Sequence, residues 1–225
     1  MSAAITPTGI IQELVSLSGV GVSPDGAFIT YVRTKYSKDS GKKESQVWIA
    51  DIDGGNRRQL TYVGGANANP IWAPDSSKIA FTSSREGDKP GSIAILPIAA
   101  GGEAKVIQSH LATPVVLKWS PDGTKIAYTV AIDPENPNET PRDPKAPAKV
   151  RVVSQIDYKT DGIGYRGETR FQLFILDLET GESRQVTSGL RDILHPTWSP
   201  DGKTIAATVL DGAPHLSKLG LIDVA

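Results

Sequence analysis

The fold is decided by the segment Trp119-Ser120-Pro121-Asp122-Gly123-Thr124-Lys125-Ile126-Ala127-Tyr128-Thr129. Its Ser-Pro-Asp-Gly part is a turn signal: proline presets φ at roughly −65° for the second turn position, and glycine accepts the positive φ that returns the chain into a hairpin. The residues after the turn alternate between apolar and polar. Such alternation predicts a strand with one buried face, so we expect a β-hairpin here.

Related turns recur along the chain. They are Ser23–Gly26, Ala73–Ser76, Ser120–Gly123 and Ser199–Gly202. The intervals between them are 50, 47 and 79 residues, and a tryptophan precedes the last three, at Trp72, Trp119 and Trp198. A repeat of about 40–50 residues with several strands per unit is typical of a propeller blade. The sequence therefore predicts an all-β propeller built from four-stranded antiparallel sheets.

The long third interval is explained by an insertion. The second and third strands are joined by residues 84–91 in the second unit but by residues 131–170 in the third unit. The first half of the insertion, Asp133–Ala148, contains five prolines, which predicts an exposed polyproline-like or disordered loop. In the second half, Arg151–Tyr158 alternates like an extra strand.

We divide the chain into a lead-in, residues 1–18, and an incomplete propeller of about four blades, residues 19–225. The expected blades are 19–61, 67–108, 114–187 with the insertion 131–170, and 193–225. Apolar residues in the lead-in predict one short amphipathic helix: Ile10, Ile11, Leu14, Val15 and Leu17. The fourth unit has three strands before Ala225, so we expect part of a larger propeller, with self-association through the open edge of its last blade.

The composition narrows the class of protein. The net charge is −1, with 24 Lys and Arg against 25 Asp and Glu, which argues against nucleic-acid and membrane-surface partners. Cysteine is absent, which excludes disulfides, thiolate catalysis and cysteine-ligated metals. No apolar run approaches the roughly 20 residues that cross a membrane. The first residues lack the basic and hydrophobic regions of a signal peptide, so a cytoplasmic location is expected.

The repeated side chains have structural explanations. The tryptophans before the turns should pack between blades, and the turn aspartates should stabilise the turns rather than act as catalytic carboxylates. Ser76 occupies a glycine position, so we expect its turn to adopt another type. His110, His195 and His215 are too dispersed for a metal site, and Asp51–Asn56 lacks the later glutamate of a calcium loop. No metal and no cofactor are expected.

Several segments carry a resemblance to a known family. They are Val47–Thr61, Pro70–Arg85, Trp119–Thr129, Tyr158–Tyr165 and Thr180–Glu182. With them the chain resembles the propeller of prolyl oligopeptidase family serine peptidases, nearest the acylaminoacyl-peptidase and dipeptidyl-peptidase-like subgroup. The expected fold is a WD40-like or TolB-like β-propeller, and the tyrosine-rich stretch favours the peptidase resemblance over generic TolB-like repeats. The resemblance implies an α/β-hydrolase catalytic domain and further blades as partners, and a propeller that admits only short or unfolded peptides to the active site.

This chain departs from that family in one respect. It contains no hydrolase domain and no Gly-x-Ser-x-Gly nucleophile elbow, so we expect no catalytic residues and no activity from the chain alone, although the parent would be a serine peptidase. The main alternative is a TolB-like scaffold for protein–protein interaction. A third, an enzyme with its site in the propeller funnel, would need clustered His, Asp or Glu at strand starts.

The insertion holds the candidate substrate-binding residues. They are Arg151, Tyr158, Asp161, Tyr165 and Arg166. Loops on rigid scaffolds often carry recognition, and a guanidinium or a carboxylate can pair with the charged end of a peptide substrate. The alternative is that these residues form a salt-bridged cover over the blade.

Overall fold

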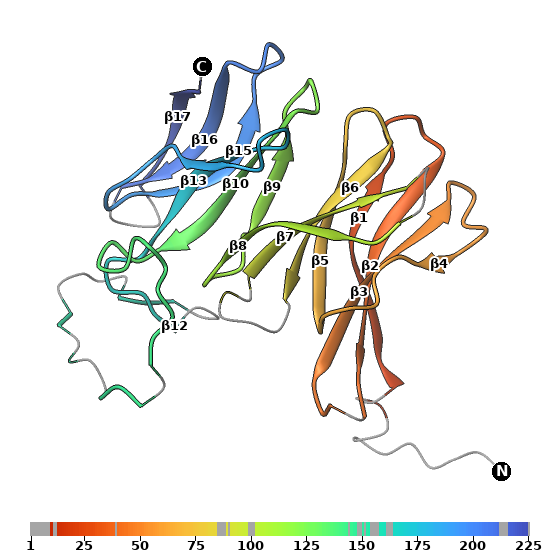
Figure 1. Cartoon of the computed structure of the whole chain (residues 1–225), viewed down its shortest axis with the longest axis horizontal. Helices are drawn as coiled ribbons and strands as arrows, with labels where there is room; N and C mark the ends of the chain where they lie inside the picture. The colour runs from red at the N-terminus through yellow and green to blue at the C-terminus, as the bar shows by residue number, and fades with distance from the viewer. Residues whose placement is uncertain are drawn as a thin grey trace. The chain divides into compact units, whose positions relative to one another are not determined.

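The computed structural model describes residues 10, 13–38, 40–84, 89, 91–98, 102–143, 145–147, 150, 152–153, 158–160, 164–211 and 216–224 (Figure 1). The strands of this part are β1 (Val15–Val22), β2 (Phe28–Tyr36), β3 (Lys43–Asp51), β4 (Arg58–Gln59), β5 (Ala66–Trp72), β6 (Lys78–Ser84), β7 (Gly91–Pro97), β8 (Lys105–His110), β9 (Val116–Trp119), β10 (Lys125–Ile132), β11 (Lys159–Thr160), β12 (Gly164–Tyr165), β13 (Arg170–Asp177), β14 (Ser183–Gln185), β15 (Asp192–Trp198), β16 (Thr204–Leu210) and β17 (Ser217–Asp223). The predicted all-β class is confirmed.

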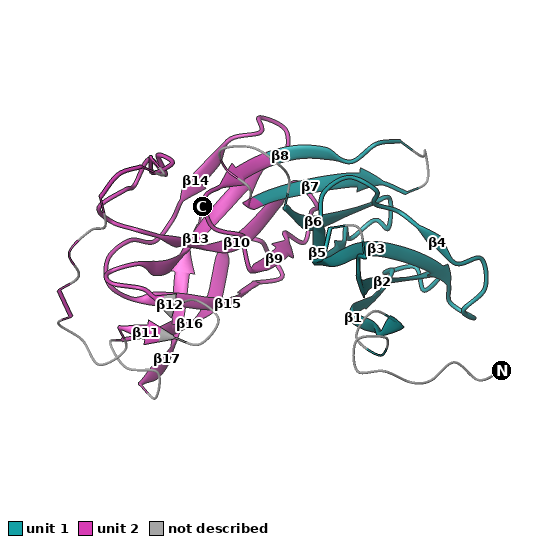
Figure 2. Cartoon of the chain, turned by 90° about the horizontal axis from the view of Figure 1, so that it is seen from below, with its two compact units in different colours: residues 1–86, 92–107 teal, residues 87–91, 108–225 magenta. Residues whose placement is uncertain are grey.

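The chain divides into two compact units, drawn in different colours in Figure 2. Unit 1 comprises residues 1–86 and 92–107, and unit 2 comprises residues 87–91 and 108–225. The first sheet has the order β1-β2-β3-β5-β6-β7-β8, with β4 on β3, and the division between the units falls within β8. Unit 2 contains the sheets β14-β13-β10-β9 and β15-β16-β17 and the two-stranded β11-β12.

Each unit has its own hydrophobic core. The single buried face expected for the strands after the turns was wrong for β6 and β10, whose central residues are all buried because both faces of these strands are covered. In unit 1 the core includes Val47, Ile49, Trp72, Ile79 and Phe81. In unit 2 it includes Ala127, Leu173, Ile175, Ile193 and Ile205. In unit 1 these residues come from two successive strand sets of one sheet, β1–β4 and β5–β8, and in unit 2 they come from two sheets. Burial of these faces therefore packs one blade on the next.

Two of the tryptophans before the turns, Trp72 and Trp198, also connect successive blades by hydrogen bonds. In unit 1 the Trp72 indole donates to the Gly21 carbonyl in β1 at 3.3 Å. In unit 2 the Trp198 indole donates to the Lys118 carbonyl in β9 at 3.0 Å. Trp72 and Trp198 occupy the same place in their blades, and so do the two acceptors. The indole therefore supplies both packing area and a directed bond between blades.

The turn aspartates hold their turns through their own side chains. Asp122 accepts bonds from the Ser120 hydroxyl at 2.6 Å and the Thr124 N–H at 3.0 Å. The bond from Ser120, followed by that from Thr124, lowers the pKa of Asp122 to about 2. Asp25 and Asp201 repeat this arrangement with Ser23 and Ser199, and their pKa values are also lowered. These contacts confirm that the aspartates stabilise turns.

The expectation for Ser76 was wrong. Its φ is +60°, close to the +73°, +71° and +70° of Gly26, Gly123 and Gly202, so the turn keeps its type. A serine in the left-handed region costs roughly 1–2 kcal/mol relative to the right-handed region. The Ser76 hydroxyl gains one contact in return, because it accepts the Asp25 N–H at 3.1 Å.

The helix expected in the lead-in is only partly present. The Leu14 N–H donates to the Ile10 carbonyl at 2.9 Å, which is one helical turn, and Ile11 lies outside the described residues. Val15 and Leu17, however, belong to β1, where they pair with Lys35 and Arg33 of β2. The edge of β2 supplies hydrogen-bond partners for the backbone of these residues, whereas a helix of this length is only marginally stable by itself.

The extra strand expected at Arg151–Tyr158 falls mostly outside the described residues, and its three described residues, Val152, Val153 and Tyr158, are not in a strand. Val152 and Val153 lie outside any strand with exposed side chains, and the paired residues are those of β11 and β12 instead. Arg151 and residues 154–157 lie outside the described residues. An alternating sequence forms a strand only where another strand offers its edge, and in the described part of the chain no strand pairs with Val152 or Val153.

Candidate functional site

The insertion of unit 2 is the candidate site, and its first half is attached to the body of the unit by a buried polar cluster. His110 at the end of β8 is 2% exposed, and its Nδ1 lies 2.6 Å from Oε2 of Glu139 in the insertion. The other carboxylate oxygen of Glu139 accepts the Leu111 N–H at 2.8 Å. One carboxylate therefore binds both a side chain and the backbone of the β8 end.

Tyr128 of β10 continues this cluster on the far side of the imidazole. Its hydroxyl lies 2.8 Å from His110 Nε2 and 2.6 Å from Ser183 Oγ of β14. The Phe174 ring stacks on Tyr128 and meets His110 edge-on, with centroids 5.4 Å apart in both pairs. Burial raises the pKa of the Tyr128 hydroxyl, which therefore stays protonated.

Glu139 remains an anion in this position. Burial alone would raise its pKa, but the hydrogen bond and the charge of His110, together with the Leu111 N–H, hold the pKa below its ordinary value. Its backbone adopts a φ of +50°, in the left-handed region that residues other than glycine rarely occupy. The Glu139 contacts thus outweigh a local strain in the loop.

The second half of the insertion is attached by an ion pair. The Arg166 guanidinium lies 2.5 Å from Asp192 Oδ2 at the start of β15, with side chains 12% and 6% exposed. Asp192 Oδ1 also accepts the Phe171 N–H at 2.9 Å. The buried Arg170 donates to the carbonyls of Gly167, Thr169 and Leu190. The ion pair of Arg166 with Asp192 therefore holds the insertion on the sheet.

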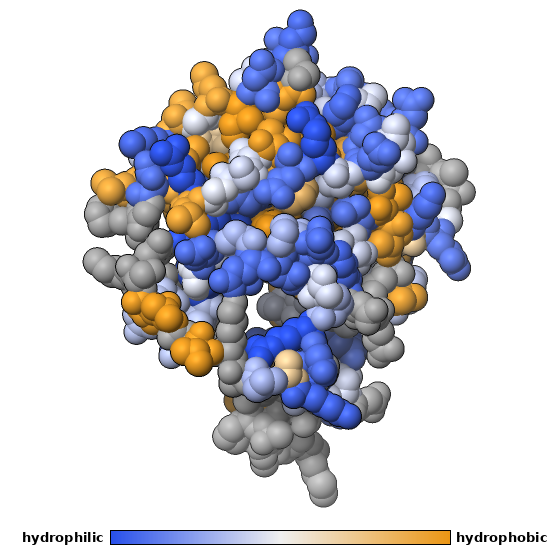
Figure 3. Space-filling model, turned by 60° about the vertical axis from the view of Figure 1, so that its left-hand side comes forward, coloured by the Kyte–Doolittle hydropathy of each residue, from blue (hydrophilic) through white to orange (hydrophobic). Residues whose placement is uncertain are grey.

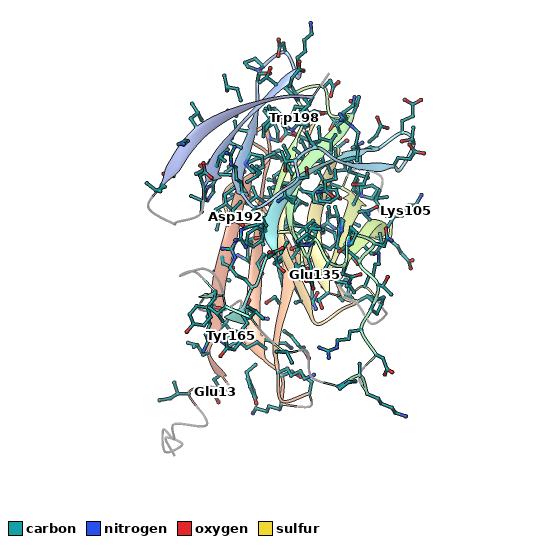
Figure 4. The ribbon with its side chains drawn as sticks, turned by 90° about the vertical axis from the view of Figure 1, so that its left-hand side faces the viewer. Glu13, Lys105, Glu135, Tyr165, Asp192 and Trp198 are labelled. Atoms are coloured by element: carbon teal, nitrogen blue, oxygen red, sulfur yellow. The ribbon has the colours of Figure 1, made fainter. Side chains whose placement is uncertain are left out.

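Two tyrosines remain accessible in the insertion. Tyr158 and Tyr165 have ring centroids 5.9 Å apart, and the Lys159 ammonium lies 5.4 Å from the centroid of Tyr165. Both rings are exposed, at 41% and 52%. In Figure 4, Tyr165 lies at the opposite end of unit 2 from Trp198, with Asp192 between them. Of the five candidate residues, Tyr158, Tyr165 and Arg166 lie in the same insertion hairpin, while Arg151 and Asp161 lie outside the described residues.

Sequence reasoning missed the members of the buried cluster. It treated His110 only as a potential metal ligand and did not single out Glu139, Tyr128 or Ser183. One signal was available. Tyr128 lies in the alternating segment that predicts a strand with a buried face, and a buried tyrosine hydroxyl needs a hydrogen-bond partner. The partners come from β8, β14 and the insertion, which are far apart in sequence.

Neither of the two described histidines is hydrogen-bonded to a serine. His110 Nε2 faces the Tyr128 hydroxyl rather than a serine, and His195 is an exposed residue at a register shift in β15. His215 lies outside the described residues. Within the described ranges, no three His, Asp or Glu side chains are placed to hold a metal ion, and no helix is long and apolar enough to span a membrane. What the site offers is an anchored loop with accessible aromatic rings.

Comparison with known families shows where this architecture belongs. The family model of the TolB beta propeller domain (PD40) matches residues 12–133. The chain belongs to this family. The predicted TolB-like β-propeller fold is therefore confirmed, and the blade repeat inferred from the turns is the repeat of a TolB beta propeller domain.

Among its relatives, this TolB-family chain is 30% identical over 200 residues to the uncharacterized peptidase YuxL of Bacillus subtilis (strain 168). The match covers 86% of the chain but 29% of YuxL, so the chain spans less than a third of that relative. The predicted resemblance to the propeller portion of peptidases is confirmed by this relative.

Two solved structures show the same fold. The acylaminoacyl peptidase of Pyrococcus horikoshii (orthorhombic crystal form) gives a TM-score of 0.72 at 18% identity, over 93% of this chain and 31% of its own. TolB from Acinetobacter baumannii gives 0.56 at 18% identity, over 93% of this chain and 41% of its own.

Proposed function

We propose that the chain is the non-catalytic, substrate-gating propeller portion of a prolyl-oligopeptidase-family serine peptidase of the acylaminoacyl or dipeptidyl peptidase type. The observation that carries the proposal is the TM-score of 0.72 with an acylaminoacyl peptidase over 93% of this chain. The 30% identity to YuxL, itself named as a peptidase, supports the same assignment. In this role the propeller restricts which peptides reach a catalytic domain.

The insertion is the part of the chain that would meet a peptide. Arg166 is held by Asp192, so its contribution is to position the hairpin that carries Tyr165. The exposed rings of Tyr158 and Tyr165 can pack against peptide side chains, and Lys159 beside them can attract a carboxylate. Arg151 and Asp161 remain candidates for the same contact.

The proposal includes two structural partners, an α/β-hydrolase domain and further blades. Apolar side chains on β17 support it, since Leu219 and Leu221 are 78% and 73% exposed. Figure 3 shows hydrophobic patches between the hydrophilic side chains of the surface. A further blade packed on β17 would cover Leu219 and Leu221, as neighbouring sheets cover the corresponding faces within each unit.

The gating role is tested in the protein encoded by the complete gene, assayed with acylated peptides of increasing length. Tyr165→Ala should lower kcat/KM by about 2- to 13-fold, the value of one aromatic contact, without lowering the melting temperature. Tyr62→Ala is the matched control, because Tyr62 is an exposed tyrosine of unit 1. Equal effects of the two substitutions, or none from Tyr165→Ala, would contradict substrate contact by the insertion.

The non-catalytic assignment has its own test. The purified chain should neither hydrolyse acylated and free aminoacyl nitroanilides nor react with a fluorophosphonate probe. Stoichiometric labelling of this chain would disprove it.

A TolB-like scaffold that binds a protein partner is the second candidate, favoured by the family match over residues 12–133 and by the fit to TolB from Acinetobacter baumannii. The sequence of the complete gene distinguishes the two candidate functions. A downstream Gly-x-Ser-x-Gly segment followed by catalytic activity supports the peptidase. A gene without such a segment supports the scaffold.

A further inference from the structure

A continuous chain of hydrogen bonds runs from β14 to the insertion of unit 2. It passes from Ser183 Oγ to the Tyr128 hydroxyl at 2.6 Å and from there to His110 Nε2 at 2.8 Å. It continues from His110 Nδ1 to Glu139 Oε2 at 2.6 Å and ends at the Leu111 N–H on the other carboxylate oxygen. We infer that this chain is a latch that fixes the insertion to unit 2 and stays closed in both protonation states of His110.

The neutral imidazole satisfies every atom of the latch in one direction. Its Nδ1–H donates to Glu139, and its Nε2 accepts the Tyr128 O–H. The Tyr128 oxygen then accepts the Ser183 O–H. His110, Tyr128 and Ser183 each use a donor or acceptor of their neutral form, and only the Glu139 carboxylate carries a charge.

In the imidazolium form the bond from Nδ1–H to Glu139 is unchanged, whereas the bonds from His110 to Tyr128 and from Tyr128 to Ser183 reverse their direction. Both ring N–H groups now donate, so the Tyr128 oxygen accepts from Nε2–H and its own proton turns toward Ser183 Oγ. Two hydroxyl protons rotate, and the heavy atoms can keep their positions. The added charge lies 2.6 Å from the Glu139 carboxylate and completes an ion pair.

Glu139 is the group whose titration opens the latch. The groups around the His110 ring are Glu139, the protonated Tyr128 hydroxyl and the apolar Phe174 ring. Lys89, whose ammonium donates to the Asn138 carbonyl at 3.3 Å, adds a positive charge beside Glu139. Once Glu139 is protonated, an imidazolium that is 2% exposed would lack a counter-charge, and such burial is unfavourable.

The direction of the pH effect follows from the pKa of Glu139, which lies below its ordinary value of 4.5. A carboxyl with a depressed folded-state pKa stabilises the folded state fully above the unfolded-state value, and this stabilisation is lost as pH falls through the lower value. The latch is therefore closed at neutral and mildly acidic pH and opens only as pH falls through the lowered pKa of Glu139. Its relevance to peptide selection rests on the proposed function, but its existence does not.

The Leu111 amide is the direct probe, because its N–H donates to Glu139. Hydrogen exchange of the whole chain, expressed as the protection factor of Leu111, should show no fall from pH 8 to pH 5 and should fall below pH 4.5. At pH 7, Glu139→Gln should lower this factor by about ten-fold or more, the effect of losing a charge-assisted bond. Trypsin should then cleave faster after Arg142 and Lys145 of the same insertion.

Glu168→Gln is the matched control, since Glu168 is an exposed carboxylate elsewhere in the insertion. It should leave the Leu111 protection factor and the tryptic rate unchanged. An unchanged protection factor in Glu139→Gln would overturn the latch, and a fall in the unsubstituted chain between pH 7 and pH 5.5 would overturn its independence of His110. The pH series needs no variant, and neither measurement needs a catalytic domain or a peptide, so a failed proposed function leaves both readable.

Discussion

Replacement of Trp72 tests the packing of the two neighbouring blades in unit 1. Trp72 is 9% exposed, lies in the core with Ile79 and Phe81, and stacks on Phe28 with centroids 6.4 Å apart. Loss of a buried tryptophan side chain costs about 3–5 kcal/mol of the free energy of unfolding. Trp72→Ala should cost this amount. Trp72→Phe retains an aromatic ring but loses the bond to Gly21, so about 1–2 kcal/mol is expected.

Trp198 provides the matched comparison in unit 2. It makes the equivalent bond to Lys118, but its side chain is only partly buried. Trp198→Ala should therefore cost roughly half as much as Trp72→Ala. Native-state hydrogen exchange resolves the two units, through peptides from β5 and β6 for one and from β15 and β16 for the other. Equal losses from the two alanine variants, or a neutral Trp72→Phe, would refute the reasoning.

Two further substitutions have defined outcomes. Gly91→Ala would place a Cβ 2.2 Å from the Ala112 carbonyl oxygen, and because that atom is backbone we expect a loss of about 3 kcal/mol in urea denaturation. Gly65→Ala, with no atom within 4 Å, should change stability by less than about 0.5 kcal/mol, and a similar loss at both sites would contradict this account. Ser120→Ala should raise the pKa of Asp122 from about 2 toward its ordinary value of 3.8, as followed by NMR. The stabilisation from Asp122 would then disappear at higher pH during acidification, while Asp201, bonded to Ser199, should titrate as before.

The parts of the fold that could be predicted from sequence are those encoded within one turn or one strand. The Pro-Asp-Gly turns and their following strands were found because each needs only four to eight consecutive residues. A longer signal was present but not used. Gln46 and Thr61 share the spacing of Gln172 and Thr187, and in both pairs the threonine hydroxyl bonds the glutamine carbonyl, at 2.7 and 2.8 Å.

The parts that could not be predicted depend on which strand lies beside which. Val15 and Leu17 fit an amphipathic helix as well as a strand, and the available edge of β2 decides between the two. The candidate site has the same limitation. Arg166 carries a charge that suits a substrate, yet Asp192, 26 residues away, already binds it. Glu139 gave no local signal at all, because its partner His110 lies in another blade.

The hydrogen bonds that the Trp72 and Trp198 indoles donate to the preceding blade also have a direction along the chain. Trp72 and Trp198 each donate to a carbonyl that precedes them, by 51 and 80 residues. During synthesis, the acceptor strand therefore leaves the ribosome before the tryptophan that binds it. The blades that carry Trp72 and Trp198 can therefore dock on a strand that has already been synthesised. Such an order limits the time for which apolar blade faces are exposed to other nascent chains.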